Sequence, residues 1–289
     1  MKKIATSELI LNADGSVYHL HLLPEQLADT VLVVGDPGRV EKVSKHFDSI
    51  ELRVQNREII THTGWIGKKR ITVLSSGMGT DNMDIVLNEL DALVNVDLKE
   101  RTPKKELKQL TIIRMGTSGG FQPDLPSDSL VASSHGIGMD GLLYFYERYP
   151  EIIDKGLTDA FIAHTNWPDL LPTPYAVASD PELLALIGKD INIAVTCTAS
   201  GFYAPQGRQI RMVPSLAGIN EKLTSFRYGD LRIGNLEMET SALYGLGGLL
   251  GHKTLTVCAI VANRYLKTFT TNYPSTMERL ILHVLGRIS

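Results

Sequence analysis

Two glycine-rich segments, each following an apolar run, carry an arginine suited to binding an anion. In VVGDPGRV, Gly35 allows the backbone to approach an anion, and Arg39 offers a fork of donors that matches phosphate oxygens. In IIRMGTSGG, Arg114 lies inside an apolar run, where a cation needs a ligand or a carboxylate partner. Thr117 and the neighbouring N–H groups can complete a phosphate nest. The spacing matches neither the dinucleotide fingerprint nor the P-loop.

Each of these segments also has a second interpretation. VVGDPGRV fits a plain turn, in which Pro37 takes the first central position and Gly38 adopts a positive φ. Residues 116–120 match G-x-S-x-G, the nucleophile elbow of serine hydrolases, with Ser118 as nucleophile and His252 or His283 as base. This hydrolase hypothesis requires a triad geometry that spacing alone does not establish.

The segment GNLEMETSALYGLG places two carboxylates at the start of an apolar helix. Glu239 is suited to accept hydrogen bonds from a sugar diol while Met238 lies against the ribose, and Glu237 stands beside them. The alternative is structural, because acidic residues stabilise a helix N-terminus and methionine fills cores.

The segment ASGFYAPQGRQIR combines three side chains that suit a pyrimidine base. Phe202 offers a ring for the face of the base. Gln206 offers a donor and an acceptor, and Arg208 adds two further donors for an edge that presents O2, N3–H and O4. The alternative is an ordinary Gly/Pro-rich loop.

A pair of histidines, His19 and His21, has the spacing of two metal ligands. No nearby carboxylate or cysteine cluster completes a coordination set, so we expect a polar-contact role and no metal site. Cys197 and Cys258 lie in separate apolar runs and support neither a disulfide nor a CxxC site. Arg57, in QNREII, is interpreted as a surface residue on a strand.

The elements that position these residues alternate between β-branched runs and helix-like segments, which predicts a mainly parallel sheet covered by helices on both faces. Ligands in such sheets bind beyond the carboxyl ends of the strands. We expect Asp81 or Asn82 to cap one helix, and Asp180 with Pro181 to begin another. The charged stretch 97–108 is predicted to be a solvated excursion without chemistry. The expected strands are 30–34, 71–75, 111–115, 129–132, 191–196 and 254–261, and the expected helices are 81–94, 180–187, 239–250 and 275–285.

The composition is that of a globular protein, with 43% hydrophobic and 21% charged residues among 289. No linker divides the chain, so we expect one domain over residues 1–289. The net charge of −3 argues against a nucleic-acid partner, because such proteins carry a basic excess. Thr6, Ser7 and Glu8 interrupt the first apolar stretch, so we expect no signal peptide, no membrane span and a cytoplasmic location.

Together these segments resemble the nucleoside phosphorylase-I family and, within it, the uridine phosphorylases. The resemblance runs from about Val17 to Arg264, and more weakly through the last helix. Several short motifs in one order are far more specific than any one of them. The matching pieces are VYHLHL, VVGDPGRVEKV, NREI, SSGMG, IRMGTSGGFQP, GFYAPQGR, LEMETSAL and AIVANR.

The resemblance implies a three-layer α/β/α fold with a mixed central sheet, and it assigns a role to each matching position. The phosphate-binding positions are Gly35, Arg39, Arg57, Arg114 and Thr117. The ribose-binding positions are His19, Met238 and Glu239, and the base-binding positions are Phe202, Gln206 and Arg208. In these enzymes the residues at the positions of His19 and Arg57 come from the neighbouring subunit, so a homodimer is the expected minimum unit.

The implied reaction is reversible phosphorolysis of uridine, deoxyuridine or thymidine, with inorganic phosphate as co-substrate and no cofactor. Arg39, Arg114, Glu239 and Arg208 are the implied catalytic residues. Purine-specific relatives carry an Asp where this chain has Asn263, and Asn263 cannot protonate a purine. The alternatives are a purine phosphorylase, a nucleosidase that uses water, the serine hydrolase above and a non-catalytic nucleoside-binding protein.

Overall fold

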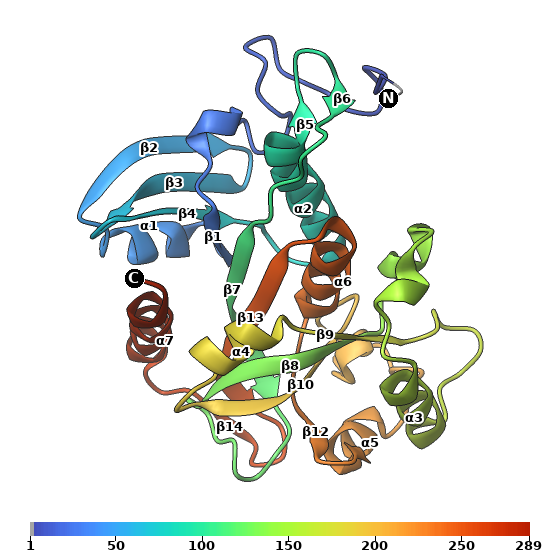
Figure 1. The fold of residues 1–289 in the computed structure, drawn as a ribbon. Coiled ribbons are helices and arrows are strands. Elements are labelled where there is room, and N and C mark those ends of the chain that lie inside the picture. The colour runs from blue at the N-terminus through green and yellow to red at the C-terminus, as the bar shows by residue number, and fades with distance from the viewer. Residues whose placement is uncertain (1–2) are drawn as a thin grey trace.

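A twelve-stranded mixed sheet forms the centre of the protein (Figure 1), and the computed structural model describes residues 3–289. Four strands run parallel in the order β4 (Lys69–Ser75), β1 (Thr30–Val34), β7 (Thr111–Gly120) and β13 (Lys253–Asn263). They bring the segments after β1 and β4 to the same edge as the later part of β7. The predicted parallel arrangement is therefore confirmed for this part of the sheet.

The other half of the sheet curves back onto the first. β8 (Leu130–Gly138) is antiparallel to β13, whereas β10 (Asn192–Thr198) and β12 (Leu231–Glu237) continue parallel to β8. The end of β12 then pairs with the end of β7, where Asn235 lies opposite Gly120. This closing pair makes a ring of five strands, β7, β13, β8, β10 and β12.

The remaining strands extend or edge this core. β2 and β3 form an antiparallel hairpin that continues the sheet beyond β4. β9 pairs with β8, β11 pairs with β12, and β14 pairs with β13. The bounds are β2 Ser49–Asn56, β3 Ile59–Ile66, β9 Tyr175–Ala178, β11 Arg227–Tyr228 and β14 Thr268–Phe269.

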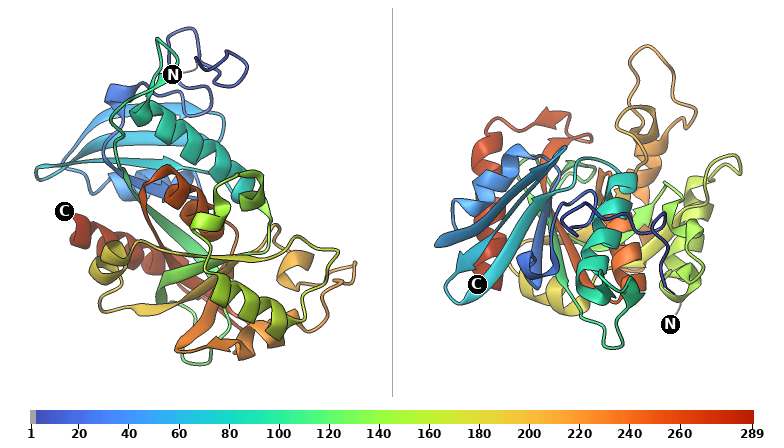
Figure 2. Two further views of the ribbon diagram at one scale, coloured as in Figure 1. Left: turned by 45° about the vertical axis from the view of Figure 1, so that its right-hand side comes forward. Right: turned by 90° about the horizontal axis from the view of Figure 1, so that it is seen from above.

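Helices cover both faces of the sheet, which confirms the predicted three-layer arrangement (Figure 2). α2 (Thr80–Asn95) and α6 (Thr240–Leu250) pack together on one face. α4 (Pro181–Ile187) and α7 (Tyr273–Ile288) pack together on the other, with α1 (Gly38–Ser44) against β3 and β4. The remaining helices are α3 Lys155–Thr165, α5 Ile219–Ser225 and the 3₁₀ turns Pro24–Gln26, Leu142–Phe145, Tyr149–Glu151 and Ala204–Gln206.

Strand β1 shows why its sequence is apolar throughout. Val31 and Val33 point into the core formed with α2 and α6, whereas Leu32 and Val34 point into the core formed with α1 and α7. A strand buried on both faces reads as a continuous apolar run because successive side chains alternate between the faces.

Several local predictions can be checked against the backbone. Asp180 caps α4 as expected, because its carboxylate accepts a hydrogen bond from the N–H of Leu183. The expected cap of α2 is wrong, since the N-cap residue is Gly79, whose φ of 101° favours glycine. The turn expected in VVGDPGRV is present, because the N–H of Arg39 donates to the carbonyl of Asp36 with Pro37 at the first central position. The positive φ expected at Gly38 is wrong, because Gly38 is the first residue of α1.

The charged stretch 97–108 is more ordered than predicted. It contains the second strand of a small hairpin, β5 (Val96–Asp97) with β6 (Thr102–Pro103). Arg101, in the turn of that hairpin, donates hydrogen bonds to the carbonyls of Ile4 and Ala5. The hairpin therefore holds the N-terminal segment against the protein. Among residues 3–289, no helix has the length and apolarity needed to cross a bilayer.

Candidate active site

A cavity of about 650 Å³ opens beyond the carboxyl ends of the central strands. A volume in this range accommodates a small-molecule ligand. Eight segments distant in the sequence line it: the β1–α1 connection, the β2–β3 turn at Glu58, the β4–α2 connection, strand β7, the loop after β10, the end of β12, the end of β13 and β14 at Phe269. The predicted site residues on the wall are Gly35, Arg39, Arg114, Thr117, Phe202, Gln206, Arg208, Met238 and Glu239.

Arg39 provides an unbalanced positive charge in this cavity. Its side chain comes from the first turn of α1 and is only 5% exposed. One Nη donates to the carbonyl of Met115 at 3.1 Å and the other to the hydroxyl of Tyr273 at 2.8 Å. Within residues 3–289, no carboxylate oxygen lies within 4.0 Å of a guanidinium nitrogen of Arg39. Arg39 lines the cavity. A buried cation without a counter-charge favours an anionic ligand.

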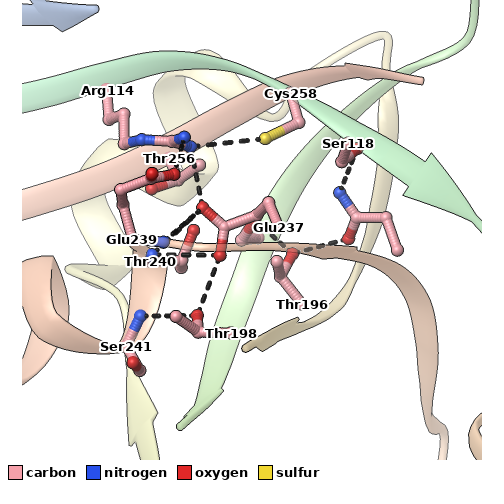
Figure 3. A network of polar contacts seen from close by, with 12 residues as sticks. Arg114, Ser118, Thr196, Thr198, Glu237, Glu239, Thr240, Ser241, Thr256 and Cys258 are labelled. Atoms are coloured by element: carbon pink, nitrogen blue, oxygen red, sulfur yellow. Dashed lines mark hydrogen bonds and ion pairs between the residues drawn. The ribbon is translucent and has the colours of Figure 1, made fainter. Parts of the chain in front are cut away.

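Arg114 differs from Arg39 because two carboxylates already surround it (Figure 3). One Nη lies 2.9 Å from Glu237, and the other forms an ion pair with Glu239. Burial alone would lower the pKa of the guanidinium, but the charges of Glu239 and Glu237 raise it above its ordinary value. The guanidinium folds back over Gly116, where a Cβ would lie only 2.2 Å from one Nη. Gly116 therefore provides the space that this triad needs.

Glu237 is fully occupied within the protein. It accepts hydrogen bonds from the hydroxyl of Thr198 at 2.8 Å and from the backbone N–H groups of Glu239 and Thr240 at 3.0 and 3.1 Å. With Arg114 added, its two oxygens have four different donors. Glu237 thus fixes the turn between β12 and α6 and orients Arg114, as Figure 3 shows.

Glu239 keeps more of its hydrogen-bonding capacity free for a ligand. Its carboxylate accepts from the N–H of Gly79 at 2.7 Å and from Arg114, and it lines the cavity. Desolvation raises the pKa of Glu239; Arg114 opposes this shift and the charge of Glu237 adds to it. An ionised carboxylate with free lone pairs can accept hydrogen bonds from hydroxyl groups.

The loop after β10 presents the third group of predicted residues. The Arg208 guanidinium lies 3.8 Å from the centre of the Phe202 ring and donates to the Phe202 carbonyl at 2.6 Å. It also donates to the side-chain oxygen of Gln206, which leaves the amide NH₂ of Gln206 as its unused group. Burial lowers the pKa of Arg208. The loop therefore offers mainly donors, which suit carbonyl oxygens.

Arg264 is a member of this loop's network that the sequence analysis did not single out. It donates to the backbone carbonyl of Gln206 at 2.6 Å. Burial, followed by the charge of Arg208, lowers the pKa of Arg264 to about 10. Its only sequence signal was its place in the AIVANR motif after β13.

His19 and Arg57 lie outside the cavity and close to each other. Nδ1 of His19 is 2.6 Å from Glu89, and the Arg57 guanidinium lies over the ring of Tyr18. Arg57 has a φ of 53° in the tight turn between β2 and β3, so its predicted place on a strand is wrong. His21 contacts Asp14, and no metal-type cluster of His, Cys, Asp or Glu occurs within residues 3–289.

The serine-hydrolase hypothesis does not agree with the geometry. Ser118 lies within strand β7 rather than on a strand-to-helix turn, and its hydroxyl accepts a hydrogen bond from Asn235 at 2.8 Å. His252 contacts the N–H of Leu110, and His283 contacts the carbonyl of Ile187. Neither histidine contacts Ser118.

The fold and the cavity together define an enzyme of the pentosyltransferase class, built on the nucleoside phosphorylase fold. The chain belongs to the phosphorylase superfamily, whose family model matches residues 29–285. The resemblance noted from the sequence motifs is thereby confirmed.

Individual relatives agree with this assignment. A uridine phosphorylase of Thermococcus kodakarensis is 29% identical over 274 residues, which cover 93% of this chain and 85% of the relative. A DeoD-type purine nucleoside phosphorylase of Colwellia psychrerythraea is 26% identical over 250 residues, covering 84% of this chain and 85% of the relative. The crystal structure of a Trypanosoma brucei nucleoside phosphorylase with uridine phosphorylase activity superposes with a TM-score of 0.85 at 29% identity, covering 96% of this chain and 99% of that one.

Proposed function

We propose that this enzyme is a uridine phosphorylase, which converts uridine and inorganic phosphate to uracil and ribose 1-phosphate in pyrimidine salvage. One observation carries the proposal. Arg39, whose charge has no carboxylate partner, lines the same cavity as the donor-rich loop of Gln206 and Arg208. The carboxylate of Glu239 lines this cavity too. Such a site suits an anion, a diol and a carbonyl-bearing base.

Phosphate binding is assigned to the end of the cavity that contains Arg39. Arg39 would hold the dianion against C1′ together with Thr117 and the N–H groups near Gly35. Arg114 carries a charge already balanced by two carboxylates, so its contribution is orientation and hydrogen bonding rather than net charge. The phosphate itself would stabilise the positive charge that develops on the ribose.

The ribose would lie between phosphate and base. Glu239 would accept hydrogen bonds from the 2′ and 3′ hydroxyls, and Met238 would pack against the sugar ring. In the reaction a phosphate oxygen bonds to C1′ while the C1′–N1 bond breaks. The electron pair passes to uracil, whose negative charge spreads to O2 and O4. Arg208 and the amide NH₂ of Gln206 would stabilise that charge, and the released anion takes a proton from water.

The role of Asn263 supports a pyrimidine rather than a purine. This residue is 1% exposed, and its NH₂ donates to the carbonyls of Gln122 and Leu125 at 2.9 and 2.7 Å. Its side-chain oxygen accepts from the N–H of Leu266. Asn263 is thus bound within the protein and, being an amide, supplies no acid for a purine leaving group.

The placement of His19 and Arg57 supports a homodimer or a larger homo-oligomer. Both lie beside Tyr18 and outside the cavity of their own chain. Glu89 binds Nδ1 of His19, which leaves Nε2 for a ribose hydroxyl of a neighbouring subunit. Arg57 would extend to the neighbour's phosphate. We also propose a cytoplasmic location, no resident cofactor and no nucleic-acid partner, in keeping with the two free, buried cysteines and the net charge of −3.

The test is release of uracil from uridine with and without inorganic phosphate, with inosine as the purine control. Uracil release that depends on phosphate supports the proposal. Release in water alone would identify a nucleosidase, and a preference for inosine would identify a purine phosphorylase. Tight binding without turnover would identify a nucleoside-binding protein.

A further inference from the structure

Tyr273 contacts the guanidinium of Arg39 from helix α7, which lies on the same face of the sheet as α1. The tyrosine is the first residue of α7, and its hydroxyl accepts a hydrogen bond from Nη2 of Arg39 at 2.8 Å. Nη1 of Arg39 donates to the carbonyl of Met115 on β7 at 3.1 Å. The two Nη atoms of the guanidinium thus donate to two different neutral acceptors, the Met115 carbonyl and the Tyr273 hydroxyl, which together fix its plane.

The choice of a hydroxyl as acceptor has a chemical consequence. A carboxylate at this position would orient Arg39 but would also neutralise it and repel an incoming anion. A tyrosine hydroxyl orients the guanidinium and leaves its charge available. A guanidinium has five N–H donors, so three remain after these two hydrogen bonds.

The start of α7 is held firmly enough to serve as a support. Asn272 caps the helix by accepting from the N–H of Ser275. Asp128 accepts hydrogen bonds from the hydroxyls of Thr270 and Thr276, which lie on either side of Tyr273. Tyr273 itself packs against the core beside α7 and does not line the cavity, so it has no contact with a ligand there.

We propose that Tyr273 is a positioning residue for the anion site: its hydroxyl sets the orientation of Arg39 and thereby the affinity for phosphate. This inference rests on the proposed function, in which Arg39 binds phosphate. It assigns a role to α7, an element that contributes no residue to the wall of the cavity.

The test is the substitution Tyr273→Phe, which removes the hydroxyl and keeps the ring. We expect the KM for phosphate to rise about tenfold, the range of one hydrogen bond to a charged group, while the KM for uridine stays within about twofold. Tyr144→Phe is the matched control, because the Tyr144 hydroxyl donates to the carbonyl of Pro174, a residue outside the cavity wall. In the control neither KM should change.

A second measurement separates positioning from general damage. In an Arg39→Ala background, Tyr273→Phe should have no further effect on the KM for phosphate, because the tyrosine acts through Arg39. An additive effect would overturn the inference, as would an unchanged KM for phosphate or an equal rise in both KM values. The wild-type enzyme is measured first. Absence of phosphate dependence there would refute the proposed function rather than the role of Tyr273.

Discussion

Glu237 and Glu239 are both buried, both paired with Arg114 and two residues apart, yet the structure predicts different consequences for their substitution by glutamine. The amide keeps the shape of the carboxylate, removes its charge and turns one acceptor oxygen into a donor. Glu237 has four hydrogen-bond donors from the protein, and Glu239 has two. We therefore expect Glu237→Gln to reduce mainly stability and Glu239→Gln to reduce mainly activity.

The magnitude for Glu237 follows from the donors that lose their acceptor. Replacing Oε2 by NH₂ leaves the N–H of Glu239 and one Nη of Arg114 without it, and the remaining hydrogen bonds lose their ionic character. At roughly 1 to 3 kcal/mol for each buried donor, the cost is about 3 kcal/mol. In a chain of this size that cost corresponds to a fall in Tm of about 6 to 12 °C.

For Glu239 the expected pattern is reversed. Only Gly79 and Arg114 donate to it, and Glu237 still balances Arg114 after the substitution. We expect Tm to fall by about 2 to 4 °C, as for a loss of about 1 kcal/mol. The kcat/KM for uridine should fall about 100-fold, because the acceptor for the ribose hydroxyls is lost.

The assay combines calorimetric unfolding with steady-state kinetics on the two variants and the wild type. A Tm for Glu237→Gln within about 2 °C of the wild type would refute the assignment of Glu237 as a structural anchor. Equal losses of kcat/KM in both variants, at equal Tm, would show that the two carboxylates share one role.

Three further predictions concern the base, the pH profile and the subunits. Arg208→Ala should lower kcat with uridine by a factor of roughly ten to a thousand, because a donor to the leaving base is removed; an unchanged kcat would contradict this role. Desolvation raises the pKa of Glu239 above 4.5, so its carboxylate becomes protonated, and kcat/KM should fall, as the pH drops through a value above 4.5. The folded protein binds this proton more tightly than the unfolded chain, so the contribution of Glu239 to the unfolding free energy should fall as pH rises through the same window. A profile of kcat/KM that is flat down to pH 4.5 would contradict the first statement, and a flat profile of unfolding free energy would contradict the second. Mixing His19→Ala with Arg208→Ala subunits should restore about a quarter of the wild-type activity through hybrid dimers, whereas no restoration would show that His19 does not act across subunits.

The sequence predicted the central strands well and their ends less well. The strand expected at 111–115 continues to Gly120, because its last residues pair with β13 and β12, and β12 lies more than a hundred residues further along the chain. Gly79 rather than Asp81 caps α2, since the connection after β4 needs a positive φ there. Turn conformations and long-range pairings of this kind are set by the tertiary structure and leave little local signal.

In the candidate site, too, residues with a local sequence signal were predicted, whereas contacts set by the tertiary structure were not. Gly35, Arg39 and Thr117 were predicted from glycine-rich segments after strands, and all three line the cavity. The protein partners of the two arginines, Arg39 and Arg114, were not predicted. Glu237 anchors Arg114 from 123 positions away, and Tyr273 contacts Arg39 from 234 positions away. No spacing rule relates residues so far apart, because only the folded sheet brings them together.

The closing pair between β7 and β12 also bears on how the enzyme can be re-engineered. β7 is hydrogen-bonded to β1, β13 and β12, so a substitution within it is transmitted to the walls on both sides of the cavity. The loop that carries Phe202, Gln206 and Arg208 instead follows the last residue of β10 and lies outside the sheet, where Arg264 donates to the carbonyl of Gln206. Exchange of that loop between relatives should therefore transfer base preference as a module, while changes in β7 would alter the handling of both substrates at once.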